Sequence, residues 1–125
     1  MALELTDERY HHVAKQYWQG LRNSPPKLIT SSYVFNEIVT FLNSRNHHDK
    51  AVEIGNRLLN STTIQMVQVD EALFFEGWQY FQQHDDKSYS LTDCISFIVM
   101  SRLNIQMALT FDKHFVQAGY QRVPI

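Results

Sequence analysis

Hydrophobic residues recur at helical spacing in five segments of the chain, and short stretches rich in branched residues separate them. The first segment ends before Pro25 and Pro26, because proline cannot continue the hydrogen-bond ladder of a helix. Its apolar face consists of Tyr10, Val13, Ala14, Tyr17, Trp18 and Leu21. The spacing therefore predicts a helix that begins near Thr6, whose hydroxyl can cap it.

Four further helices are expected, each with a polar residue at its start. Ser31 or Ser32 is expected to cap the second, Asp70 the fourth and Ser90 the fifth, while the third follows a polar loop over residues 43–48. The apolar positions are Val34, Ile38, Phe41 and Leu42 in the second, Ala51, Val52, Ile54, Leu58 and Leu59 in the third, Leu73, Phe74, Trp78 and Phe81 in the fourth, and Leu91, Ile95, Ile98 and Val99 in the fifth. Trp78 and Phe81 are predicted to be core residues, whereas Phe75 is predicted to be an exposed anchor for a partner.

Candidate strands cover residues 27–30, 63–69, 105–110 and 122–125. They alternate with single helices or helix pairs. This order is typical of a parallel sheet with helices on both faces, an α/β/α sandwich of three layers. We expect residues 1–125 to form a single domain, because no linker, repeat or low-complexity tract interrupts them.

Charge and cysteine content exclude several classes of protein. The net charge of −2 at pH 7 argues against a strongly basic nucleic-acid-binding module. Cys94 is the only cysteine, so neither an internal disulfide nor a cysteine zinc site can form. No apolar run is long enough to cross a bilayer, and no signal peptide is evident. These features predict a cytoplasmic protein without a membrane partner.

Three acids follow the predicted strands. Glu37 lies shortly after the strand ending at Thr30, Asp93 lies in the first turn of the fifth helix, and Asp112 follows the strand ending at Thr110. Ligands of open α/β sheets bind beyond the carboxyl ends of the strands. Clustered carboxylates favour a cation between them, and hard oxygen ligands select Mg²⁺ or Mn²⁺. Such an ion can activate water against a phosphodiester.

Each acid also has a structural interpretation. Ser90 and Asp93 match a capping box, in which Asp93 only satisfies the start of the helix. Asp112 has the position of an N-cap after a strand, and Glu37 that of a solvated residue beside an apolar stripe. From spacing alone, these interpretations are favoured over a metal site.

Three segments resemble the acidic motifs of PIN domains. TSSYVFNE over residues 30–37 resembles the segment with the second acid, and SYSLTDCISF over 88–97 resembles that with the third. ALTFDKHF over 108–115, followed by Ala118, Gly119 and Tyr120, resembles that with the fourth. The resemblance spans nearly the whole chain and implies a PIN-like α/β fold with Glu37, Asp93 and Asp112 as catalytic and metal-binding residues.

Within this family, the chain most resembles the VapC-type toxins. This resemblance implies that the chain is a metal-dependent endoribonuclease that uses Mg²⁺ or Mn²⁺. It also implies an RNA substrate, a small antitoxin partner and a homodimer. PIN domains begin with a strand that ends in an Asp, and we expect that first strand and its acid to be missing here, with weak activity as the consequence. The alternatives are a non-catalytic PIN remnant that binds a partner or RNA, and, ranked last, a flavodoxin-like fold.

The remaining polar residues give weaker predictions. RNA is expected to meet a thin basic set formed by Lys87, Arg102, Lys113, Arg45 and Lys50. Thr30, Ser31 and Thr110 are expected either to orient the acids or to cap and end their elements, and His114 either to approach the phosphate or to pack on the sheet edge. The pairs His11–His12 and His47–His48 are predicted to lie on the surface, and Cys94 in the core.

Overall fold

The computed structural model describes residues 28–109 and 113–123, which fall into two compact units. The first unit ends at Val69, and the second begins at Asp70. The predicted first helix, the His11–His12 pair, Thr110 and Asp112 lie outside the described residues. The single domain over residues 1–125 stays a prediction.

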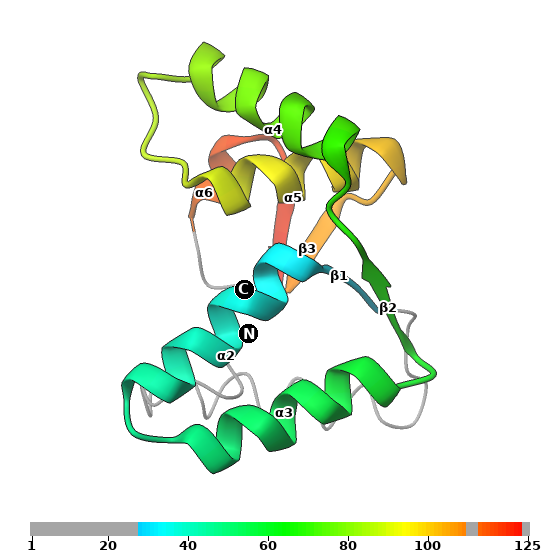
Figure 1. The fold of residues 1–125 in the computed structure, drawn as a ribbon. Coiled ribbons are helices and arrows are strands. Elements are labelled where there is room, and N and C mark those ends of the chain that lie inside the picture. The colour runs from blue at the N-terminus through cyan, green and yellow to red at the C-terminus, as the bar shows by residue number, and fades with distance from the viewer. Residues whose placement is uncertain (1–27, 110–112, 124–125) are drawn as a thin grey trace. The chain divides into compact units, whose positions relative to one another are not determined.

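The first unit contains a parallel strand pair joined by two helices (Figure 1). Its elements are β1 (Leu28–Ser31), α2 (Ser32–Ser44), α3 (His48–Asn60) and β2 (Ile64–Val67). Leu28 pairs with Ile64 and Ser31 with Val67. Parallel strands cannot be joined by a tight turn, so α2 and α3 together form the crossover between them.

Helices α2 and α3 lie side by side and bury one stripe each (Figure 1). The buried side chains are Ile38 and Leu42 of α2 and Ala51, Ile54 and Leu58 of α3. A Cβ at Gly55 of α3 would lie 3.3 Å from Cζ of Phe35, so this glycine sits at the contact between the helices. Val52 and Leu59 lie outside the stripe and are exposed.

The second unit contains α4 (Glu71–Gln83), α5 (Leu91–Arg102), β3 (Met107–Leu109), α6 (His114–Gln117) and β4 (Gln121–Val123). Strands β3 and β4 are parallel, with Met107 opposite Gln121. Every strand pairing in the described part of the chain is thus parallel, as predicted, and the expected sheet is seen there as two pairs. No described helix is long and apolar enough to cross a bilayer.

Helix α5 forms the centre of this unit. Its buried residues are Cys94, Ile95, Phe97, Val99 and Met100. The Phe97 ring meets Tyr89 and Phe115 edge-on, at centroid distances of 5.0 and 4.9 Å. The Tyr120 hydroxyl donates a 3.0 Å hydrogen bond to the Phe97 carbonyl oxygen. The aromatic core therefore holds α6 and Tyr120, the residue before β4, against α5.

The prediction that Trp78 and Phe81 of α4 are core residues was wrong. Trp78 and Phe81 are 42% and 38% exposed, and their rings stack on each other at 5.5 Å. Leu73 is buried, as predicted, and so is Gly77. Apolar residues surround this helix on several sides, so periodicity alone did not identify its inner face. Phe75, predicted to be exposed, is 52% exposed.

Candidate functional site

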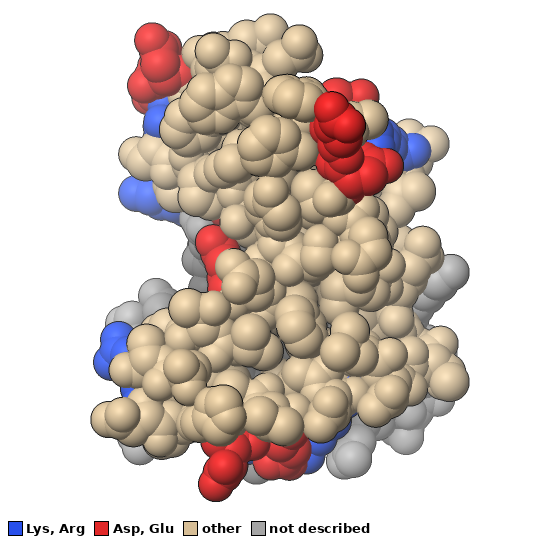
Figure 2. All heavy atoms as spheres, in the orientation of Figure 1, with Lys and Arg blue, Asp and Glu red and all other residues tan. Residues whose placement is uncertain are grey.

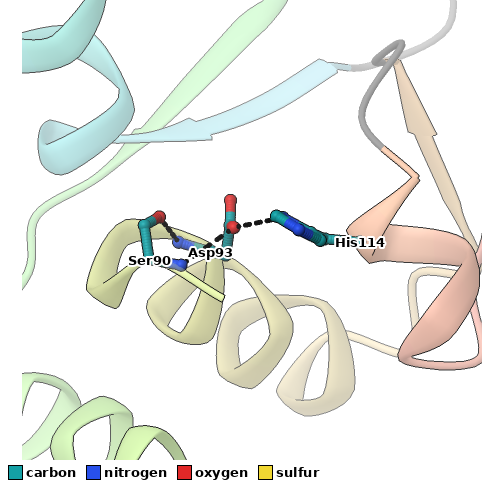
Figure 3. Close-up of polar contacts among 3 residues, drawn as sticks. All are labelled: Ser90, Asp93 and His114. Atoms are coloured by element: carbon teal, nitrogen blue, oxygen red, sulfur yellow. Dashed lines mark hydrogen bonds and ion pairs between the residues drawn. The ribbon is translucent and has the colours of Figure 1, made fainter. Parts of the chain in front are cut away.

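Asp93 is the third residue of α5 and completes a capping box with Ser90 (Figure 3). The Asp93 backbone N–H donates to Oγ of Ser90 at 3.0 Å, and the Ser90 backbone N–H donates to Oδ2 of Asp93 at 3.1 Å. These two bonds satisfy donors that the first turn of a helix leaves without partners. The capping interpretation of Asp93 is therefore confirmed.

His114, the first residue of α6, contacts the same carboxylate. Its Nδ1 lies 3.1 Å from Oδ2 of Asp93, and the two side chains are only 20% and 15% exposed. The imidazole also meets the Tyr89 ring edge-on at a centroid distance of 5.5 Å. Asp93 is thus held by one group of its own helix and by one group of a different element.

The two oxygens of Asp93 have different surroundings. Oδ2 faces both Ser90 and His114, whereas Oδ1 accepts no hydrogen bond from any described residue and points away from both partners in Figure 3. A carboxylate with one oxygen fixed and the other available suits monodentate coordination of a hard cation. The geometry of Asp93 is therefore compatible with a capping role and with a divalent metal ion together.

Glu37 is an exposed residue in the second turn of α2. The helix starts directly after β1, because Oγ of the buried Ser31 accepts a 3.3 Å hydrogen bond from the Val34 N–H. Ser31 is therefore a capping residue, and Glu37 follows the carboxyl end of a parallel strand, as predicted. Ser32 instead accepts a 3.0 Å hydrogen bond from the Val69 N–H.

The described residues contain no group of three or more His, Cys, Asp or Glu side chains able to hold a metal ion together. Asp112, the third predicted ligand, lies outside them, and Glu37 and Asp93 belong to different units. The convergence of Glu37, Asp93 and Asp112 on one ion stays a prediction.

Cys94 lies next to Asp93 but faces the core. It is fully buried, and burial, followed by the Asp93 charge, raises the pKa of its thiol to about 11. Since the thiolate is the reactive form, Cys94 is not a nucleophile at neutral pH. The prediction of a small core residue is confirmed.

Several predicted RNA-binding cations have acidic or aromatic neighbours. Arg102 forms a 2.8 Å ion pair with Glu76, and Lys87 lies 3.7 Å from Asp86. Arg45 lies over the Phe41 ring at 5.0 Å. On the face drawn in Figure 2, acidic and basic side chains lie in small scattered groups, several of which contain both kinds. His47 and His48 are exposed, as predicted.

The contact between His114 and Asp93 was not found from the sequence. The two residues are 21 positions apart and come from different helices. No spacing rule connects such positions, since helical periodicity relates residues only within one element. The only signal in the sequence for a role of His114 is its position two residues after Asp112.

Comparisons with known proteins agree with this fold. The sequence profile of the PIN domain matches residues 1–119. The chain is 35% identical over 122 residues to a Mycobacterium tuberculosis protein named 23S rRNA-specific endonuclease VapC20, covering 98% of this chain and 90% of that protein. The same sequence similarity is found for the protein of that name in a second strain.

A crystal structure of Mycobacterium tuberculosis VapC20, described as a sarcin–ricin loop cleaving toxin, superimposes with a TM-score of 0.85. The two chains are 34% identical, and the match covers 95% of this chain and 88% of the other. The α/β arrangement of parallel strands and helices is therefore PIN-like. With a profile match over residues 1–119 and relatives of this similarity, the chain belongs to the PIN domain family.

Proposed function

We propose that this chain is a divalent-metal-dependent endoribonuclease of the toxin–antitoxin type. The observation that carries the proposal is the Asp93 carboxylate, which is fixed through one oxygen and leaves the other to a cation. Identity of 35% to a 23S rRNA-specific endonuclease supports the choice of RNA as the substrate. In this proposal Glu37, Asp93 and Asp112 share an ion, Mg²⁺ or Mn²⁺.

The bound ion would supply an activated water and charge stabilisation at the phosphodiester. The residues of the chain then have distinct tasks. Asp93 offers Oδ1 as a ligand while Oδ2 stays hydrogen-bonded. Glu37 is exposed and therefore accessible to solvent and ions. Cys94 takes no part, because its thiol is buried and protonated.

For the substrate, we propose a structured ribosomal RNA hairpin, since the relative of known structure is described as cleaving the sarcin–ricin loop. For the partner, we propose a small antitoxin protein, and for the assembly a homodimer in the cytoplasm. Lys87 and Arg102, two of the predicted RNA-binding cations, have acidic neighbours, so RNA affinity should be modest and should fall with added salt.

The test is cleavage of an end-labelled sarcin–ricin-loop hairpin by the purified protein, with Mg²⁺, with Mn²⁺ and with a chelator. We expect cleavage at one site with either ion and none with the chelator. Asp93→Asn should lose the cleavage, whereas Asp86→Asn should retain it, because Asp86 is an exposed acid of the same unit. Cleavage that survives Asp93→Asn or the chelator would contradict the proposal. Hairpin binding without cleavage would favour the non-catalytic binding module.

A further inference from the structure

We propose that His114 is a positioning residue for Asp93, whose Nδ1–H holds Oδ2 and thereby directs Oδ1 toward the metal ion. The inference rests on the proposed function in one respect, since it takes Asp93 as a metal ligand. His114 itself need touch neither the ion nor the RNA. The relevant contact is the 3.1 Å approach of Nδ1 to Oδ2.

A capping bond alone does not fix this carboxylate. The Ser90 N–H donates to Oδ2 at 3.1 Å, and a single hydrogen bond to one oxygen leaves the carboxylate some freedom to turn about the Cβ–Cγ bond. A second donor on the same oxygen, coming from α6, would restrict that rotation further. Outer hydrogen bonds of this kind orient metal ligands and are worth roughly 10–100-fold in metal affinity.

The surroundings of His114 suit this role. An ionised carboxylate is only an acceptor, so the Nδ1 atom that faces it must carry the proton. Both side chains are largely shielded from water, and this strengthens a hydrogen bond between them. The Tyr89 ring, itself 6% exposed, fixes the imidazole from the side with an interplanar angle of 82°. The imidazole of His114 is thus held in place by its contact with Tyr89 of the aromatic core.

The competing interpretation is that His114 only fastens α6 to α5. His84 provides a matched control, because its ring lies 6.1 Å from the same Tyr89 and its Nδ1 bonds to the Tyr80 carbonyl oxygen, without a contact to Asp93. His114→Asn provides the conservative variant, since its side-chain amide can place an N–H close to the position of Nδ1.

The experiment measures Mn²⁺ affinity by electron paramagnetic resonance of the free ion, without RNA. Relative to the unmodified protein, His114→Leu should bind Mn²⁺ about 10-fold more weakly, His114→Asn should recover most of that loss, and His84→Leu should bind normally. Equal affinity of His114→Leu and the unmodified protein would overturn this inference alone. An Asn variant as weak as the Leu variant would do the same. Absence of Mn²⁺ binding by the unmodified protein would overturn the proposed function as well.

A second measurement needs no substitution. It tests whether Nδ1 of His114 donates to Asp93 even if His114→Leu fails to fold. Long-range nitrogen–proton NMR of the unmodified protein reports which ring nitrogen of His114 carries hydrogen. We expect a protonated Nδ1. A His114 ring with hydrogen only on Nε2 cannot donate to Oδ2, and that result would overturn the proposal.

Discussion

Gly77 of α4 and Ile95 of α5 approach so closely that a Cβ at Gly77 would lie 2.5 Å from Cγ1 of Ile95. No real side chain tolerates that separation, and Ile95 is fully buried, so it has little room to move. The missing side chain of Gly77 thus permits the close packing of α4 on α5. Because α5 also carries Asp93, this contact supports the element that presents the proposed ligand.

Gly77→Ala is expected to destabilise the protein. Overpacking in a filled core costs about 1–3 kcal/mol, and the better helix propensity of alanine offsets up to about 1 kcal/mol of that. Urea denaturation measures the change. Gly55→Ala is the matched control, since its Cβ would meet the ring of Phe35 at 3.3 Å, a side chain that can shift. A Gly77→Ala protein as stable as Gly55→Ala would contradict the close contact.

Ser90→Ala and Asp93→Asn are expected to separate capping from metal binding. Ser90→Ala removes the hydroxyl acceptor and should cost about 1 kcal/mol of stability. The Ser90 backbone N–H remains, so Mn²⁺ affinity should stay close to that of the unmodified protein. Asp93→Asn keeps an oxygen for the cap but removes the anionic ligand, so Mn²⁺ affinity should be lost. Thermal denaturation and Mn²⁺ titration of both variants check this. Equal loss of Mn²⁺ affinity in the two variants would contradict it.

Stability is expected to fall at alkaline pH through Cys94. Burial raises the pKa of its thiol in the folded protein from 9.0 to about 11. Below pH 9 the thiol is protonated in both states, and its contribution to stability is complete. Between pH 9 and 11 the unfolded chain loses this proton first, so stability falls as pH rises, by roughly 2 kcal/mol at most.

Urea denaturation across that pH range measures the fall, with Cys94→Ala as the control. Burial also raises the pKa values of Tyr80, Tyr89 and Tyr120, so an alkaline loss of stability remains in the control. The Cys94→Ala protein should nevertheless show a shallower fall. Identical slopes for both proteins would mean that the thiol does not take part.

Leu73→Ala and Trp78→Ala test which of the predicted core residues of α4 is buried. Leu73 is 1% exposed, and truncating a buried leucine costs about 2–5 kcal/mol. Trp78 is 42% exposed, and its ring stacks on the ring of Phe81, which is 38% exposed. The Trp78 variant should therefore lose much less stability than the Leu73 variant. The reverse order in urea denaturation would contradict the exposure of Trp78.

Local features of the fold were predictable from the sequence. Ser31, Asp70 and Ser90 accept hydrogen bonds from Val34, Leu73 and Asp93, as expected for capping residues ahead of apolar runs. The strands were also found within one or two residues of their observed bounds. These predictions succeeded because capping and strand patterns depend on neighbouring residues.

Features that depend on distant residues were not predictable in the same way. The inner face of α4 is decided by where α5 packs, and with aromatic residues on several sides its sequence does not encode that choice. At the site, the capping role of Asp93 was predicted from the local sequence, whereas its metal-binding role was predicted only from the family resemblance. The second donor on its carboxylate, His114, comes from a helix whose placement depends on the packing of Phe115 and Tyr120 against Phe97.

Through the capping box, Asp93 stabilises the folded chain independently of any catalytic role. If a descendant lost the proposed nuclease activity, it would still be under selection to retain an acid at this position, because losing it weakens the start of α5. Mutational drift after loss of activity should therefore erase Glu37, which makes no such contact, before it erases Asp93. An aspartate at the position of Asp93 is consequently weak evidence that a homologous protein is an active nuclease.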